Sequence, residues 1–82
     1  MEAKELIRRY SAGKRNFERA NLSRANLSGA NLSHAHLREA YLRATDLSHA
    51  NLEGADVAPG QLSWEVTLEL EGATMPDGTR HE

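Results

Sequence analysis

Three histidines are the side chains of this sequence whose type most suggests chemistry. Neutral imidazole is a common zinc ligand, so His34, His36 and His49 raise the question of a metal site. In the fold inferred below, His34 and His36 flank one corner and His49 belongs to a different side, so the three do not converge easily. The sequence therefore favours solvated turn residues over ligands at these positions, and it predicts no metal site.

Other catalytic arrangements have no better support. No serine is placed beside a histidine with a third orienting group. The chain has no cysteine, which excludes disulfides and thiolate ligands. It also lacks a glycine-rich phosphate loop. The sequence therefore predicts a protein that is not an enzyme and holds no cofactor.

A five-residue repeat positions all of these side chains. Read in fives from Ala20 to Pro59, the chain is ANLSR, ANLSG, ANLSH, AHLRE, AYLRA, TDLSH, ANLEG and ADVAP. The preceding five residues, 15–19, fit with Phe17 in the Leu slot, which makes nine consecutive units. On an α-helix, Leu at every fifth residue would step by about 140° and form no stripe. Such a period instead predicts a solenoid, in which short extended segments alternate with turns and coils stack about 4.8 Å apart.

The A-[N/D]-L-x-x pattern resembles the pentapeptide-repeat family over residues 15–59. The resemblance implies an all-β solenoid, a right-handed quadrilateral β-helix with four units per coil and about two coils. Residues twenty apart would then stack on one side. The predicted structural core is Phe17, Leu22, Leu27, Leu32, Leu37, Leu42, Leu47, Leu52 and Val57, with Ala20, Ala25, Ala30, Ala35, Ala40, Ala50 and Ala55 between them.

Several positions carry more specific expectations. Thr45 stands in an Ala slot, so its hydroxyl must find a backbone carbonyl inside. Arg15 cannot face inward, which predicts a distorted first unit. The outward Asn residues are expected to bond the backbone at turns, and Gly29 and Gly54 to adopt positive φ. Between coils, the register predicts two opposite-charge contacts, Glu18 with Arg38 and Arg19 with Glu39.

The two ends are expected to cap a single domain made of residues 1–14, 15–59 and 60–82. Residues 2–12 predict a helix whose apolar face, Ala3, Leu6, Ile7 and Tyr10, covers Phe17 in the first coil.

After Pro59, the alternation in residues 62–71 indicates a strand, whereas the resemblance favours a short helix. We expect a helical turn near 60–66 followed by extended chain, with Trp64 over the last coil. Leu70, Ala73 and Met75 imitate a last partial unit, Asp77-Gly78 makes a turn, and residues 79–82 are expected to fray. Such cap-like ends predict a complete chain.

Charge is distributed unevenly along the chain, whose net charge is −2. Residues 1–24 hold seven Lys or Arg against three acids, and residues 46–82 hold eight acids against Arg80. The solenoid should therefore be basic at one end and acidic at the other. This fits ordinary solvated charge, and it leaves open a homodimer or an end-to-end association. No membrane segment or signal peptide is visible, direct nucleic-acid binding is not expected, and the localisation expected is cytoplasmic.

Two functions remain. The first is a scaffold for an unknown protein partner, with Arg24, Tyr41 and Arg43 as the candidate interaction surface. The second follows from the resemblance, because some pentapeptide-repeat proteins are DNA mimics that inhibit type II topoisomerases such as gyrase. Residues 16–59 hold five acids and four bases, and two coils span only about 11 Å, so the scaffold is the better supported.

Overall fold

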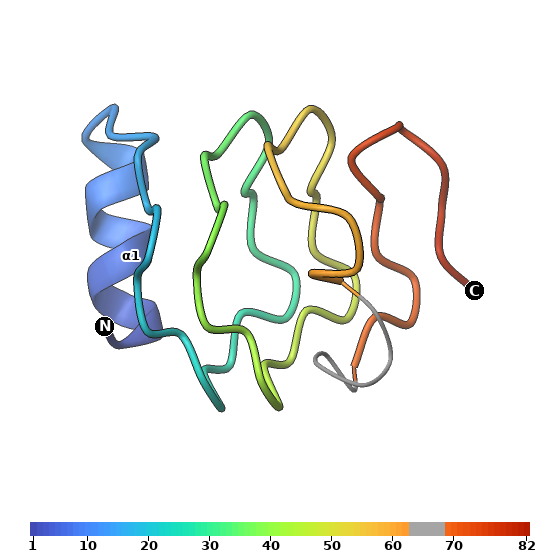
Figure 1. The fold of residues 1–82 in the computed structure, drawn as a ribbon, viewed down its shortest axis with the longest axis horizontal. Coiled ribbons are helices and arrows are strands. Elements are labelled where there is room, and N and C mark those ends of the chain that lie inside the picture. Colours follow the sequence, from blue (N-terminus) through green and yellow to red (C-terminus); the bar gives the residue numbers. More distant parts are fainter. Residues whose placement is uncertain (63–68) are drawn as a thin grey trace.

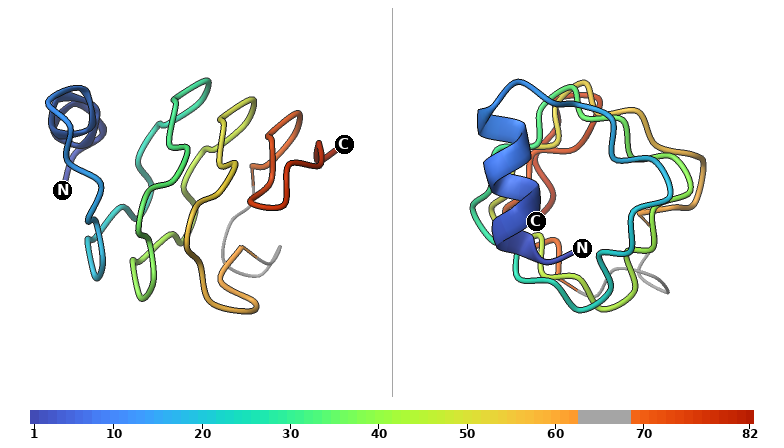
Figure 2. Two further views of the ribbon diagram at one scale, coloured as in Figure 1. Left: turned by 90° about the horizontal axis from the view of Figure 1, so that it is seen from above. Right: turned by 90° about the vertical axis from the view of Figure 1, so that its left-hand side faces the viewer.

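The chain winds into a short stack of coils with one helix, α1 (Ala3–Ser11), lying across one end (Figure 1). The structure, a computed structural model, describes residues 1–62 and 69–82. Isolated parallel bridges join residues twenty apart, and this spacing corresponds to four five-residue units per coil. The bridges are Asn16–His36, Asn21–Tyr41, Asn26–Asp46, Asn31–Asn51 and His36–Asp56. Viewed along the axis, successive coils superpose (Figure 2).

Each unit closes with the same tight turn. In the second unit, the Ala25 N–H donates to the Leu22 carbonyl at 3.0 Å, and Arg24 between them has a φ of 64°. A positive φ at the third residue of a hydrogen-bonded turn is typical of type II. The Asn21 Oδ1 accepts the Ser23 N–H at 3.2 Å, and the pattern recurs at Asn16, Asn26, Asn31, Asp46 and Asn51. The prediction that the Asn side chains bond the backbone is confirmed.

Positive φ is more widespread at these corners than the glycines suggested. Gly29 and Gly54 have φ of 71° and 72°, as expected. Arg19, Arg24, His34, Glu39, Ala44 and His49 adopt φ between 59° and 65° in the same place of their units. The conformation therefore belongs to the repeat and not to glycine, and the surrounding hydrogen bonds stabilise it against its intrinsic cost.

The interior is a stack of apolar side chains. Every Leu-slot residue from Phe17 to Leu52 is at most 2% exposed. Thr45 is fully buried among them, and its hydroxyl donates to the Leu22 carbonyl at 2.8 Å, which confirms the expected partner. Four core predictions hold only in part. Ala20, Ala25, Ala30 and Val57 are half-buried, the alanines because no coil lies below them and Val57 because the next coil is incomplete.

The first unit is regular, so the prediction that Arg15 distorts it is wrong. The Arg15 carbonyl accepts the His36 N–H at 2.8 Å, and the Phe17 N–H donates to the His36 carbonyl at 2.9 Å, as in later units. The side chain turns toward α1 instead. Its guanidinium stacks on the Tyr10 ring at 3.7 Å and donates to the Tyr10 carbonyl at 3.0 Å. A cation is thus accommodated at this slot because the end of the solenoid is open there.

Helix α1 covers part of the first coil, within the range predicted for it. Leu6 is fully buried and joins the apolar stack. The Tyr10 hydroxyl donates to the Ser33 carbonyl at 2.8 Å, and the Met1 nitrogen donates to the Asn21 carbonyl at 2.7 Å. Ile7 is 46% exposed, so its placement on the buried face was wrong. In the described part of the chain, no helix has the length and apolar character to cross a membrane.

The register changes after the third coil begins. Asp46 bridges Glu69 and Asn51 bridges Thr74, spacings of twenty-three in place of twenty. Leu70 (6% exposed) and Ala73 (0%) therefore continue the apolar stack. The sequence predicted about two coils because only the strict repeats were counted. That count omits this partial third coil. The strand and helix predictions through residues 63–68, Trp64 included, lie outside the described residues, while residues 59–62 form turns.

The last residues reverse direction and pair with the final coil. The Gly72 N–H donates to the His81 carbonyl and the His81 N–H donates to the Ala73 carbonyl, both at 2.7 Å. Thr74 and Arg80 form an antiparallel bridge, in contrast to all the parallel ones. The expectation that residues 79–82 fray is therefore wrong. Asp77 makes the predicted turn, since its Oδ1 accepts the Thr79 N–H at 3.0 Å.

Candidate interaction surface

The three residues proposed as an interaction surface lie on one side of the coils. The Tyr41 N–H donates to the Ala20 carbonyl at 2.9 Å, and the Arg24 N–H donates to the Arg43 carbonyl at 2.9 Å. Arg24 is thus held directly beside Arg43 and Tyr41 by the coil above it. All three side chains are exposed, and Tyr41 is 63% exposed. The structure therefore brings Arg24, Tyr41 and Arg43 together.

A shallow depression adjoins Tyr41. Its lining includes Ser23, Glu39, Tyr41, Arg43 and Gln61. The backbone under these side chains is held by the ladder hydrogen bonds, so the surface is organised before any partner binds.

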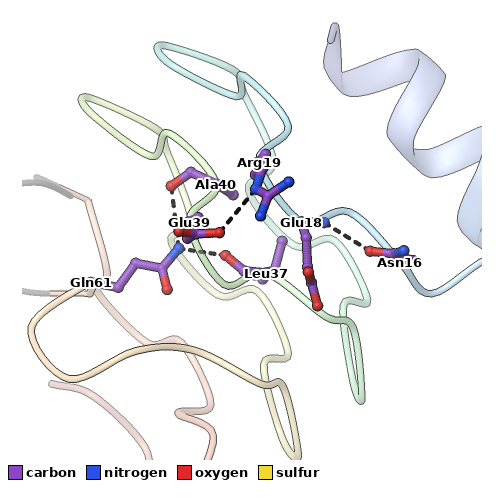
Figure 3. A network of polar contacts seen from close by, with 7 residues as sticks. All are labelled: Asn16, Glu18, Arg19, Leu37, Glu39, Ala40 and Gln61. Carbon is purple, nitrogen blue, oxygen red and sulfur yellow. Dashed lines mark hydrogen bonds and ion pairs between the residues drawn. The ribbon is translucent and has the colours of Figure 1, made fainter.

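Gln61 is a residue of this surface that the sequence reasoning missed. Its Nε2 donates to the carbonyls of Leu37 and Ala40 (Figure 3). Its Oε1 accepts the Ala58 N–H at 2.9 Å. One coil lower, the Ala20 carbonyl accepts the backbone N–H of Tyr41. At Ala40, the side chain of Gln61 takes that place, because the chain leaves the coil here. In the sequence, the only sign of this role was a single glutamine directly after Pro59-Gly60, where the five-residue repeat ends.

Two ion pairs cross between coils near this surface. The Arg19 Nε lies 3.0 Å from Glu39 Oε1, which confirms one predicted contact and raises the pKa of Arg19 through its hydrogen bond to that carboxylate. The second predicted pair is wrong, because Arg38 reaches upward to Asp56 Oδ1 at 2.8 Å and not down to Glu18. Both pairs are largely exposed and therefore screened by solvent, so they contribute little to stability.

These pairs leave the candidate surface positively charged. Within residues 1–62 and 69–82, neither Arg24 nor Arg43 has a carboxylate within ion-pair distance. The side around Tyr41 therefore offers two guanidinium groups beside an aromatic ring. Arg and Tyr are enriched at protein interfaces because both combine apolar area with directional hydrogen bonding.

The histidines lie at different places on the coils. The imidazole of His34 packs against Gly54 in the next coil, and that of His49 packs against Gly72, so that a Cβ added at either glycine would overlap the ring. His36 is exposed on another side. Among the residues that the structure describes, no group of three or more His, Cys, Asp or Glu is arranged to hold a metal ion. The His–Gly contact was missed, although His34 and Gly54 stand twenty apart.

Comparison with known proteins adds one match. A family model for pentapeptide repeats aligns with eight copies over residues 16–57, just over half of the chain. A comparison with curated proteins finds no match. Proteins with such repeats in general form a right-handed quadrilateral β-helix and serve as structural or interaction proteins.

Proposed function

The chain belongs to the pentapeptide-repeat family, and from this premise we propose that it is a non-enzymatic scaffold. It would present to a protein partner the surface formed by Arg24, Tyr41 and Arg43, called the Tyr41 side below. The observation that carries the proposal is Tyr41 itself. It is one of two large hydrophobic side chains exposed among the described residues, and it is 63% exposed. Its N–H donates to the Ala20 carbonyl and its carbonyl accepts the Leu22 N–H, so two hydrogen bonds fix its backbone to the coil below and the ring is presented from a rigid support.

The division between interior and exterior supports this role. Among the described residues, the interior is filled by apolar side chains, since the Leu slots from Phe17 to Leu52 are almost fully buried. Outside, the side chains vary from unit to unit while the backbone stays the same. A binding surface built this way can change without altering the core, as in other repeat proteins.

The alternative, DNA mimicry toward a type II topoisomerase, has less support. A phosphate mimic needs carboxylates that remain free to meet basic side chains of the partner. Of the five acids in residues 16–59, two, Glu39 and Asp56, are already engaged with Arg19 and Arg38. A gyrase supercoiling assay at constant salt tests this alternative directly, with a charge-matched protein as control. Specific inhibition would make mimicry the function.

The scaffold proposal is tested by photo-crosslinking in cells of the source organism. A benzophenone amino acid replaces Tyr41 in one protein and His36 in another. His36 is the matched control, because it occupies the same slot of its unit, is exposed, and lies on a different side. A defined crosslinked protein at position 41 and none at position 36 is the expected result. Equal crosslinking at both positions, or none at either, would overturn the proposal.

A second variant separates loss of binding from loss of folding. Arg43→Ala should weaken capture of the crosslinked partner and leave the thermal midpoint unchanged, because the Arg43 side chain is exposed. Full capture by Arg43→Ala would exclude a contribution of this guanidinium to the surface.

A further inference from the structure

Helix α1 has a face that no other part of the described chain covers. Lys4, Ile7, Arg8 and Ser11 follow the spacing i, i+3, i+4, i+7 and therefore form one stripe. All four are exposed, and Ile7 is 46% exposed. The buried residue of the helix, Leu6, points to the coils. Lys4 and Arg8 each stand two residues from Leu6, which is about 200° around a helix, so they lie on the side of α1 opposite to that buried residue. The helix itself lies across the end of the molecule (Figures 1 and 2).

The cations of this stripe are not used within the molecule. Arg9 pairs with Glu5, and Arg15 stacks on Tyr10. In residues 1–62 and 69–82, by contrast, neither Lys4 nor Arg8 forms an ion pair. The helix therefore presents two cations one turn apart with an exposed apolar side chain between them.

The opposite end of the molecule has the complementary charge. Residues 69–82, the described part of the final coil and tail, hold one arginine, Arg80, and four exposed acidic residues, Glu69, Glu71, Asp77 and Glu82. Glu71 and Glu82 line one depression together with His49, Gly72, Arg80 and His81. The two ends are separated along the longest dimension of a molecule that measures 30 × 21 × 21 Å, so one copy cannot satisfy its own charges.

We infer that the outer face of α1 docks on the acidic end of a second copy of this chain. Lys4 and Arg8 of one copy would lie against Glu71 and Glu82 of the next. The contact joins two different surfaces, so it does not close on itself as a two-fold dimer does, and each added copy leaves one basic and one acidic end free. The association is therefore open-ended and axial.

The size of the ends determines how strong this contact is. A cross-section of 21 × 21 Å would bury on the order of 900 Å² in total from both copies, below the roughly 1,200–2,000 Å² of stable specific interfaces. Charge then supplies much of the attraction, and exposed charges are screened over about 10 Å at 0.1 M salt. We expect weak association that strengthens at low ionic strength.

Axial association would repeat the Tyr41 side at intervals of about one molecule. If that side binds a partner, the assembly binds several partners at once and gains avidity without new contacts. This consequence depends on the proposed function. The contact between copies does not.

Sedimentation velocity of the full chain, over a concentration series, tests the inference. The sedimentation coefficient should rise with concentration at about 25 mM salt, and the association should weaken about tenfold or more at about 300 mM salt. Lys4→Glu with Arg8→Glu, and separately Glu71→Lys with Glu82→Lys, should each abolish it. A mixture of the two charge-reversed proteins should associate again, because acidic ends then meet basic ends.

The control is Arg24→Glu with Arg43→Glu, which reverses the same number of charges on the side of the coils. This variant should associate as the wild type does, so failure of the end contact and failure of the Tyr41 surface are distinguishable. Circular dichroism and the thermal midpoint verify folding of every variant. A wild type that is monomeric at both salt concentrations, or one whose association survives charge reversal at either end, would overturn the inference.

Discussion

The two ends of the solenoid are closed by different kinds of interaction. At the N-terminal end, α1 inserts the fully buried Leu6 into the apolar stack. At the C-terminal end, residues 79–82 are all exposed and hold the last coil through backbone bonds, such as those of His81 to Gly72 and Ala73. The first closure depends on a side chain, the second on the main chain.

This difference matters because the two interactions have different net free energies. Full burial of a leucine contributes about 1.5–3 kcal/mol from transfer alone. A backbone hydrogen bond contributes about 0.5–1.5 kcal/mol net, and ordering each tail residue costs about 1–2 kcal/mol of entropy. The N-terminal closure should therefore be the stronger, while the C-terminal closure should open first.

Leu6→Ala should have the largest effect. It removes a fully buried side chain and leaves a cavity between α1 and the first coil, so we expect a loss of about 2–5 kcal/mol in the free energy of unfolding. Urea unfolding followed by circular dichroism measures this. Ile7→Ala is the matched control on the same helix, and its exposed side chain predicts a change within about 0.5 kcal/mol. Equal losses from the two variants would show that α1 does not close the end.

Gly72→Ala should cause the next largest loss in the free energy of unfolding, and it tests the C-terminal end. Gly72 and Gly29 share a φ near 72°, at 74° and 71° respectively, but only Gly72 has an imidazole, that of His49, where a Cβ would lie. Either substitution costs about 1–2 kcal/mol for the left-handed backbone, and displacing His49 adds to the cost at Gly72 alone. In a His49→Ala background, the two substitutions should cost the same. If Gly72→Ala still costs more than Gly29→Ala in that background, the extra cost arises from the backbone of the last coil and not from His49.

The repeat made the coils predictable from the sequence, because every unit meets the same local requirement. An Asn or Asp at most second slots and an apolar residue, usually Leu, at each third slot specify a turn and an inward side chain, and neither depends on distant residues. Thr45 could be assigned a carbonyl partner for the same reason, since its slot alone determined that it is buried. The Arg19–Glu39 pair also followed from the period.

Interactions outside the repeat could not be predicted in this way. Arg38 pairs with Asp56 and not with Glu18. The period could not predict this, because a flexible side chain between two coils can reach a carboxylate in either one. The shift from twenty to twenty-three residues at Asp46–Glu69 depends on how many residues leave the coil, which no local pattern records. On the candidate surface, the period placed Arg24, Tyr41 and Arg43 together, whereas Gln61 reached it from a segment without a repeat.

Removing residues 79–82 should have a smaller effect than either substitution. The truncation deletes the backbone bonds from Gly72 and Met75 to the tail, but it also removes the entropy cost of ordering four residues. We expect a loss of about 1 kcal/mol or less. Urea unfolding should be done at about 0.3 M salt, where contacts between charged ends are screened. A loss as large as that of Leu6→Ala would mean that the tail, and not α1, is the principal closure.

Acid should loosen the C-terminal turn at Asp77, and this is the smallest effect. The Asp77 carboxylate accepts hydrogen bonds from the Thr79 hydroxyl at 2.6 Å and the Thr79 N–H at 3.0 Å. The hydroxyl first, and then the N–H, hold the pKa of Asp77 below its ordinary value.

A folded-state pKa below the unfolded value of about 3.9 means that ionised Asp77 stabilises the turn above that pH. The contribution is lost as the pH falls through the folded pKa. The Leu6 side chain and the Tyr10 hydroxyl, which hold the N-terminal end, are uncharged throughout this range, so their contacts with the coils should persist.

NMR titration of the Thr79 and Ala12 amides below pH 5 distinguishes the two ends. The Thr79 amide should shift with the Asp77 carboxylate. The Ala12 amide, which donates to the Arg8 carbonyl at the end of α1 and has no acidic residue beside it in the chain, should not shift. The pKa of Asp46 is lowered in the same manner by Ser48, so an Asp46→Asn background removes the other acid-sensitive turn. In that background, Asp77→Asn keeps an acceptor for Thr79 and should abolish the titration. A Thr79 shift that persists in Asp77→Asn would assign the acid response to a group other than this carboxylate.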